Sequence, residues 1–194
     1  MSMIVSVSVL IIAVISVLLF IGIIILGISI YNSLVTLNVN IDRSLSNIDV
    51  LLKQRFDEIP RLVEVCKGYM AHERETLQKV VEARNIFINV GANAEKFSAN
   101  SALDKALGSL FAVSEGYPEL KANEEFMHLH RRITAIENQI AERREFYNAS
   151  VAIFNTRVRQ IPDMAIANML GYKVKPMFKA ETKSELDINP VSFS

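Results

Sequence analysis

Few side chains in this sequence stand at spacings that a catalytic or metal site needs, and the three histidines come first. His72 opens the run HERET, but a zinc-protease helix needs a second histidine four residues later, where Thr76 stands. His128 and His130 are two residues apart, about 200° around a helix, so they cannot bind one ion from one face. We expect His72 to be a solvated or capping residue and His130, on an apolar stripe, to lie in the core.

The single cysteine, Cys66, is the remaining candidate nucleophile. A reactive cysteine needs exposure and a basic neighbour that lowers its thiol pKa, whereas Cys66 falls on an apolar stripe. We therefore expect a buried and inert thiol, and one cysteine cannot form an intramolecular disulfide. The sequence matches no phosphate-binding loop, dinucleotide fingerprint or serine elbow. We predict no catalytic activity, no cofactor, no metal site and no small-molecule substrate.

The charges are unevenly distributed along the chain. Its 21 basic and 21 acidic residues balance, so no electrostatic argument favours nucleic acid as a partner. No charged side chain occurs from Met1 to Ile41. Residues 31–194 are about a quarter charged, which is typical of a soluble domain of one core.

The run from Ile4 to Ile30 is uncharged and apolar. As a helix it would be roughly 40 Å long, enough to cross a ~30 Å hydrocarbon core with some tilt. A buried core helix and a cleaved signal peptide are the alternatives, but the run lacks the basic residues and the cleavage site of a signal peptide. We predict an uncleaved transmembrane anchor over residues 1–30, with the lipid bilayer as the partner of residues 4–30.

The orientation of this anchor follows from the basic residues beside it. None precedes the run, and Arg43, Lys53 and Arg55 follow it. Basic residues near a span favour the cytoplasmic side. The sequence therefore predicts a single-pass protein of the inner (cytoplasmic) membrane with its helical part in the cytoplasm.

After Tyr31 the apolar residues recur in steps of three and four, which is the pattern of amphipathic helices. The first stripe runs from Leu34 to Met70; Pro60 should kink this helix and Gly68 should end it. The second stripe ends near Val90. The two stripes define two helices, and their members are Leu34, Leu37, Ile41, Leu45, Ile48, Leu52, Phe56, Ile59, Val63, Cys66 and Met70, then Leu77, Val80, Val81 and Phe87.

The remaining helices are expected to follow after short connections. Ser101 with Asp104 resembles a helix N-terminal cap, and Gly116 should end that third helix. Pro118 suits the first turn of a long fourth helix that Ile161-Pro162 ends. A short apolar segment over Met164–Leu170 follows and should stop at Gly171. The predicted fold is all-α: an N-terminal transmembrane helix, an elongated antiparallel four-helix bundle over 31–180, and a disordered polar tail over 181–194.

Two long runs carry a resemblance to a known family. LKQRFDEIPRLVEVCKGYMAHERETL over Leu52–Leu77, followed by VEARN over Val81–Asn85, closely resembles the signature of the LemA family. The run from Tyr147 to Phe178 resembles its C-terminal pattern. The sequence departs from the family at Leu45, Arg61 and Lys179, where tryptophan, asparagine and an acidic residue are usual.

The resemblance implies a transmembrane helix followed by an antiparallel helical bundle, with no agreed biochemical activity. One relative is associated with organising magnetosome membranes, and others with membrane proteases or envelope processes. We expect a membrane-anchored scaffold or interaction module with an unidentified protein partner; the alternative is a regulatory adaptor of a membrane enzyme such as a protease.

The candidate interaction or structural residues lie mostly in the signature run. Arg143 and Arg144 form a mixed-charge helix face with their neighbours, either solvated or a partner contact. If the first two helices fold back around Ala71, Arg84 lies level with Glu58, and its stem, which continues the second stripe, should be partly buried. An ion pair with Glu58 or Asp57 is expected, and the alternative is that the guanidinium reaches water and pairs with neither. The full set is Arg55, Glu58, Pro60, Gly68, Tyr69, His72, Arg84, Arg143 and Arg144.

Overall fold

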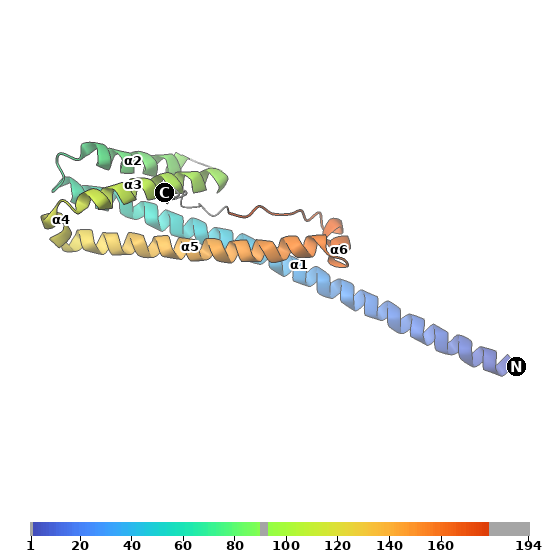
Figure 1. Cartoon of the computed structure of the whole chain (residues 1–194). Helices are drawn as coiled ribbons and strands as arrows, with labels where there is room; N and C mark the ends of the chain where they lie inside the picture. The colour runs from blue at the N-terminus through green and yellow to red at the C-terminus, as the bar shows by residue number, and fades with distance from the viewer. Residues whose placement is uncertain (1, 90–92, 179–194) are drawn as a thin grey trace, which may run out of the picture. The chain divides into compact units, whose positions relative to one another are not determined.

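A computed structural model describes residues 2–89 and 93–178, and no strand occurs among them. The chain forms α1 (Ser2–Lys67), α2 (Arg74–Asn89), α3 (Asn93–Ser114), α4 (Pro118–Ala122), α5 (Glu124–Arg159) and α6 (Asp163–Met169), as Figure 1 shows. The prediction of an all-α fold that opens with a long apolar helix is confirmed. The predicted polar tail lies outside the described residues.

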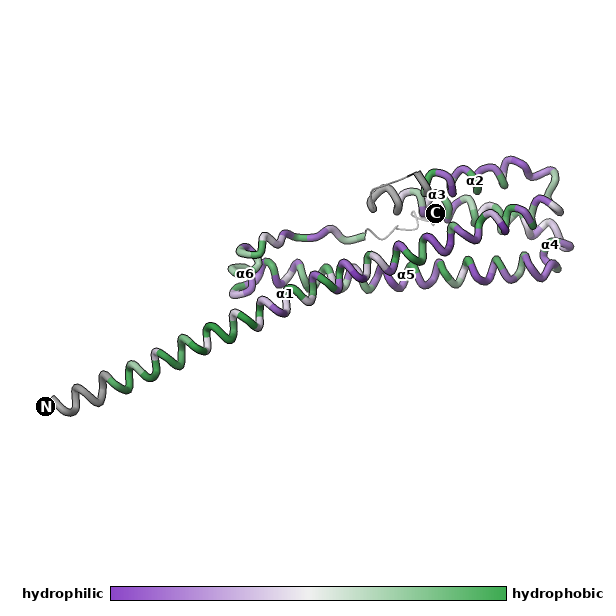
Figure 2. Tube along the Cα trace, turned by 180° about the vertical axis from the view of Figure 1, so that it is seen from behind, coloured by the Kyte–Doolittle hydropathy of each residue, from purple (hydrophilic) through white to green (hydrophobic). Residues whose placement is uncertain are grey.

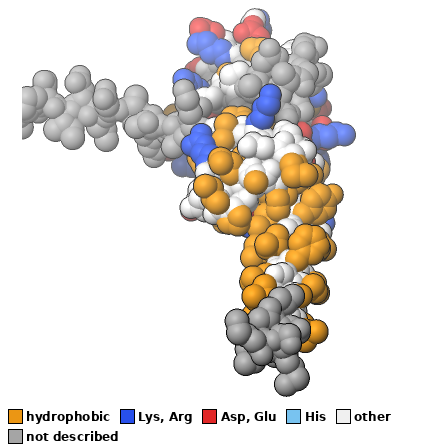
Figure 3. Space-filling view, turned by 90° about the vertical axis from the view of Figure 1, so that its right-hand side faces the viewer, with side chains coloured by type: hydrophobic (Ala, Val, Ile, Leu, Met, Phe, Trp, Pro, Cys, Tyr) orange, Lys and Arg blue, Asp and Glu red, His pale blue; other side chains and the backbone are white. Residues whose placement is uncertain are grey.

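The first part of α1 exposes its apolar side chains. Every large apolar residue from Leu10 to Ile28 is exposed, and this stretch is the hydrophobic end of the tube in Figure 2. Figure 3 shows its hydrophobic side chains facing outward. Such a surface is stable in lipid and not in water. Among the described residues, α1 is the one helix that is long and apolar enough to cross a membrane.

The chain divides into two compact units, and α1 and α5 each contribute to both. The central unit is Ser44–Glu145, and the terminal unit combines Met1–Arg43 with Phe146–Ser194. The bundle predicted over residues 31–180 is shared between these units, so its four-helix arrangement stays a prediction, as do the domain boundaries at residues 30 and 180.

The core of the central unit is built from the predicted stripes. Within this unit the chain reverses direction from α1 to α2, from α2 to α3 and again into α5 (Figure 1). The α1 stripe is buried wherever it passes through the unit except at Leu45, which is half-buried. The fully buried side chains on α1, α3 and α5 include Ile48, Leu52, Ile59, Leu103, Leu107 and Phe126.

Two helix starts differ from the predictions. α3 begins at Asn93, so Ser101 lies inside a helix and caps nothing. Pro118 begins the separate short helix α4, and α5 starts after Asn123, whose backbone is extended. The reason is local: the Asn123 side-chain oxygen accepts the Phe126 N–H at 2.9 Å, which caps α5.

The helix ends agree better with the sequence. α1 ends at Lys67, one residue before Gly68, and α5 ends at Arg159 ahead of Ile161-Pro162. α6 is followed by Gly171 with φ of +68°, a left-handed conformation that favours glycine at helix C-termini. Gly68 does not adopt this conformation: among the described residues, Gly171 is the one glycine with a positive φ.

In the terminal unit, residues 172–178 return alongside the last turns of α5 without regular secondary structure of their own (Figure 1). We call these residues the strap. Its core contacts are aromatic: Phe154 of α5 meets Tyr172 edge to face at 5.5 Å, and Tyr147 meets Phe178 at 4.6 Å between ring centroids.

Candidate functional site

Three ion pairs link α1 to α5 in the central unit. Arg61 pairs with Glu125 at 3.0 Å, Glu58 with Arg132 at 2.6 Å, and Arg55 with Glu137 at 3.2 Å between nitrogen and oxygen. The α1 members are three residues apart and therefore lie on neighbouring turns of one helix face. Since the partners follow in reverse order on α5, the two helices run antiparallel here.

Arg55 is the largest fully buried side chain, with 1% of its surface exposed. Besides Glu137, its guanidinium donates to Asp104 and, at 3.2 Å, to the side-chain oxygen of Asn100 on α3. Asn100 in turn donates to Asp104 at 3.0 Å. A planar guanidinium with several donors can satisfy partners on α3 and α5 at once. Arg55 thus joins three helices, which is a structural role.

The expected ion pair between Arg84 and Glu58 is wrong. Glu58 pairs with Arg132 on α5, while the Nε of Arg84 donates to the backbone carbonyl of Phe56 at 3.4 Å. The cause is Pro60, which lies inside α1 and has no N–H to donate to the carbonyl four residues earlier. Arg84 supplies the hydrogen bond that Pro60 cannot make.

The predicted fold-back around Ala71 is confirmed by the ring contact beside this bond. Phe56 and Phe87 stack with ring centroids 3.7 Å apart and an interplanar angle of 10°. Phe56 is 15 residues before Ala71 and Phe87 is 16 after it. The Arg84 side chain is half-buried, as its place on the stripe predicted.

The turn between α1 and α2 is joined to the segment between α3 and α5. The Tyr69 hydroxyl accepts a hydrogen bond from the Asn123 side chain at 3.1 Å, and the Tyr117 hydroxyl donates to Glu73 at 3.4 Å. Loss of hydration, and to a lesser extent the nearby Glu73 carboxylate, raise the pKa of Tyr117. His72 in the same turn is exposed, so its predicted solvated state is confirmed.

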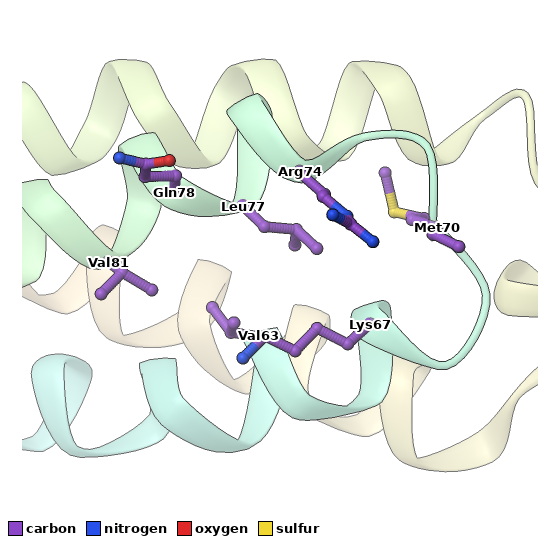
Figure 4. Close-up of a pocket in the computed structure, with 8 residues that line it drawn as sticks. Val63, Lys67, Met70, Arg74, Leu77, Gln78 and Val81 are labelled. Carbon is purple, nitrogen blue, oxygen red and sulfur yellow. The ribbon is translucent and has the colours of Figure 1, made fainter.

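A groove of about 450 Å³ opens between the end of α1 and the start of α2. Figure 4 shows side chains from both helices facing this space, which is mostly apolar with basic residues at its rim. Lys67 and Arg74 supply these cations, and neither forms an ion pair with a described residue. The lining consists of Val63, Lys67, Met70, Ala71, Arg74, Leu77, Gln78 and Val81.

Two asparagines hold the strap, and sequence reasoning missed both. The Asn155 side chain bonds both the N–H and the carbonyl of Lys175 at 2.8 Å. Asn148 does the same with Phe178 at 2.8 and 3.0 Å. Seven helical residues rise about 10.5 Å, and three extended residues span about 10 Å, so the two bonding sites match in spacing. The signal was the repeat of an aromatic residue followed by asparagine, seven residues apart.

No group of three or more potential metal ligands occurs among the described His, Cys, Asp and Glu residues. His130 is half-buried and stacks on Phe111 with ring centroids 4.0 Å apart. Cys66 is buried as expected, and burial raises its thiol pKa to about 11, which disfavours the nucleophilic thiolate. Of the arginine pair on α5, Arg143 is exposed and Arg144 half-buried.

The chain is similar to several known proteins. The model of the LemA family matches residues 44–193. Magnetosome protein MamQ 2 of Paramagnetospirillum magneticum is 24% identical over 207 aligned residues, which cover 93% of this chain and 75% of the relative. Magnetosome protein MamQ of Magnetospirillum gryphiswaldense is 24% identical, covering 74% and 62%. Protein LemA of Metamycoplasma hominis is also 24% identical, covering 74% and 66%.

Proposed function

The chain belongs to the LemA family, and from this premise we propose that it is a membrane-anchored scaffold and interaction module of the cell envelope without catalytic activity. The single observation that carries the proposal is the groove between α1 and α2. One of the two helices that line it, α1, begins with an apolar run fit to cross a membrane. The magnetosome proteins named above support a role at a membrane by their similarity.

The groove favours a protein partner of defined chemistry. Its floor is formed by apolar side chains such as Val63 and Leu77, which favour an apolar segment, as helix-in-groove recognition does. Lys67 and Arg74 at the rim favour an acidic residue beside that segment, because complementary charges steer association and fix register. We therefore propose an amphipathic segment with one acidic flank as the ligand.

Crosslinking in intact membranes tests this proposal. A photoreactive benzophenone residue at Gln78, on the rim of the groove, should give one predominant protein adduct of fixed mass. The matched control is the same residue at Gln139, an exposed glutamine on α5 outside the groove. Reversing the rim charges with Lys67→Glu and Arg74→Glu should weaken the Gln78 adduct. Equal adducts from Gln78 and Gln139, or no protein adduct from Gln78, would contradict the groove.

The second candidate function is a regulatory adaptor of a membrane enzyme such as a protease. The groove favours it equally, because an enzyme can also supply the amphipathic segment. The identity of the adduct separates the two roles. A single enzyme in a one-to-one adduct supports the adaptor, whereas further copies of this chain or several proteins support the scaffold.

We also propose that the helical part faces the cytoplasm. A cysteine introduced by Ser194→Cys should react with a membrane-impermeant thiol probe only after the inner membrane is permeabilised. The native Cys66 adds little background, because it is buried and its pKa is raised to about 11. Labelling when the outer barrier alone is open would place the helical part on the other side.

A further inference from the structure

In the terminal unit, α6 is tied to the point where the apolar run of α1 ends. Arg157, near the end of α5, donates to the Ser33 hydroxyl on α1 and forms an ion pair with Asp163, the first residue of α6. Ser33 is three residues beyond Ile30, about 4.5 Å along the helix axis. One guanidinium therefore holds the start of α6 level with the end of the membrane run.

The segment around α6 exposes large apolar side chains at this level. Ile161 is 83% exposed and Met169 87% exposed, while Met164 is 38% exposed. Ala167 is buried and lies about 160° around the helix from Met169, so α6 packs by the Ala167 side and leaves the Met169 side uncovered. In Figure 3, hydrophobic side chains gather beside the apolar helix, with Lys and Arg side chains near them.

The charges around α6 are mainly positive. Residues 157–175 carry four basic residues, Arg157, Arg159, Lys173 and Lys175, against the single acidic Asp163, which gives a net charge of +3. Arg159 and Lys173 flank the apolar side chains, are exposed, and form no ion pair with a described residue. The segment therefore combines apolar tips with free cations on both sides.

We propose that α6 and its flanks, residues 159–173, form a second membrane contact that rests in the anionic headgroup region of the leaflet from which α1 emerges. The apolar tips of Ile161, Met164 and Met169 reach the acyl boundary, and Arg159 and Lys173 meet lipid phosphates. Continuity with the anchor selects lipid over a protein partner, because the surface lies where the bilayer begins. The inference rests on α1 being the anchor that the proposed function requires.

Tryptophan fluorescence of the full chain in vesicles tests the contact. The chain contains no tryptophan, so Met169→Trp is a single reporter at a highly exposed site. In vesicles of equal parts phosphatidylcholine and phosphatidylglycerol, its emission should shift to the blue. Lipids spin-labelled near the headgroup should quench it, and aqueous iodide should quench it poorly. Ile161→Trp provides an independent second reporter and should behave alike.

Two control variants make the outcomes distinct. Phe146→Trp lies on α5, is exposed, and is 11 residues or about 16 Å before Arg157, so iodide should quench it. Phe20→Trp lies in the apolar run and should be quenched by lipids labelled deep in the acyl chains. If iodide quenches the reporters at Met169 and Ile161 as strongly as it quenches Phe146→Trp, while lipids labelled deep in the acyl chains still quench Phe20→Trp, the inference is overturned and the anchor stands. Loss of deep quenching at Phe20→Trp would contradict the anchor and the inference together.

Discussion

At the scale of single residues, the buried charge of Arg55 explains most about the central unit. A guanidinium removed from water is stable only when its donors are matched, and Asp104, Asn100 and Glu137 match it from α3 and α5. The Nε atom has no hydrogen-bond partner among the described residues, so the two terminal nitrogens make all of these bonds. Removing Arg55 would leave two carboxylates near each other and a hole where the side chain was.

We predict that Arg55→Met lowers the free energy of unfolding by about 1–3 kcal/mol, below the loss typical of a fully buried pair because Asp104 and Glu137 are partly solvated. Arg55→Lys should also destabilise, because an ammonium cannot span the three partners. Urea unfolding of the detergent-solubilised chain, followed by circular dichroism, measures both. Lys53→Met, an exposed change on the same helix, is the control and should stay within about 0.5 kcal/mol. A loss for Arg55→Met no larger than that of the control would refute this role.

The bond from Arg84 to the Phe56 carbonyl makes a second prediction, a double-mutant cycle with Pro60. Pro60→Ala supplies the missing helical N–H, so the Phe56 carbonyl no longer depends on Arg84. Arg84→Met should therefore cost about 0.5–1.5 kcal/mol more with proline at position 60 than with alanine. The same unfolding measurement gives the coupling energy. A coupling near zero would mean that the carbonyl is satisfied by water.

In this region the sequence singled out residues but did not identify their partners. Arg55, Glu58, Pro60 and Arg84 were all selected. The partners of Arg55 lie 49 and 82 residues away on other helices, so no local pattern could identify them. The predicted pair of Arg84 and Glu58 was wrong because it considered only the packing of α1 against α2. The face of α1 that carries Glu58 packs on α5 instead.

At the scale of elements, hydrophobic periodicity predicted the long helices because burial of one face determines where α1 and α5 pack. It did not predict the start of α3 at Asn93. Nor did it predict the break at Asn123, where a side-chain oxygen caps α5 and apolar spacing plays no part. The strap was not predicted, because residues 172–178 have no hydrophobic periodicity. Their position depends on polar bonds from Asn148 and Asn155.

We predict that Asn155→Ala releases the strap locally and leaves the helices intact. Two hydrogen bonds to Lys175 are lost, together worth about 1–3 kcal/mol, so the Lys175 amide should exchange its hydrogen about tenfold faster or more. Hydrogen exchange of the detergent-solubilised chain measures this. Asn138→Ala, an exposed asparagine on the same helix, is the matched control. Equal exchange at Lys175 in the two variants would rule out a holding role for Asn155.

At the scale of the whole molecule, the absence of charge from Met1 to Ile41 matters most, because it makes the first part of α1 apolar enough to cross a membrane. The same helix continues to Lys67 and packs into the central unit. This feature could be predicted from the sequence because lipid sets a simple rule on length and polarity. The groove could not, because it depends on how the ends of α1 and α2 meet at their turn.

Membrane extraction tests the central claim of a membrane-anchored helical protein most directly. We predict that the full chain stays in the membrane pellet through washes with high salt and alkaline carbonate. A chain lacking residues 1–30 should be released by the same washes, because an interfacial contact such as that of α6 is weaker and sensitive to salt. Release of the full chain, or retention of the shortened chain in the pellet, would contradict the anchor.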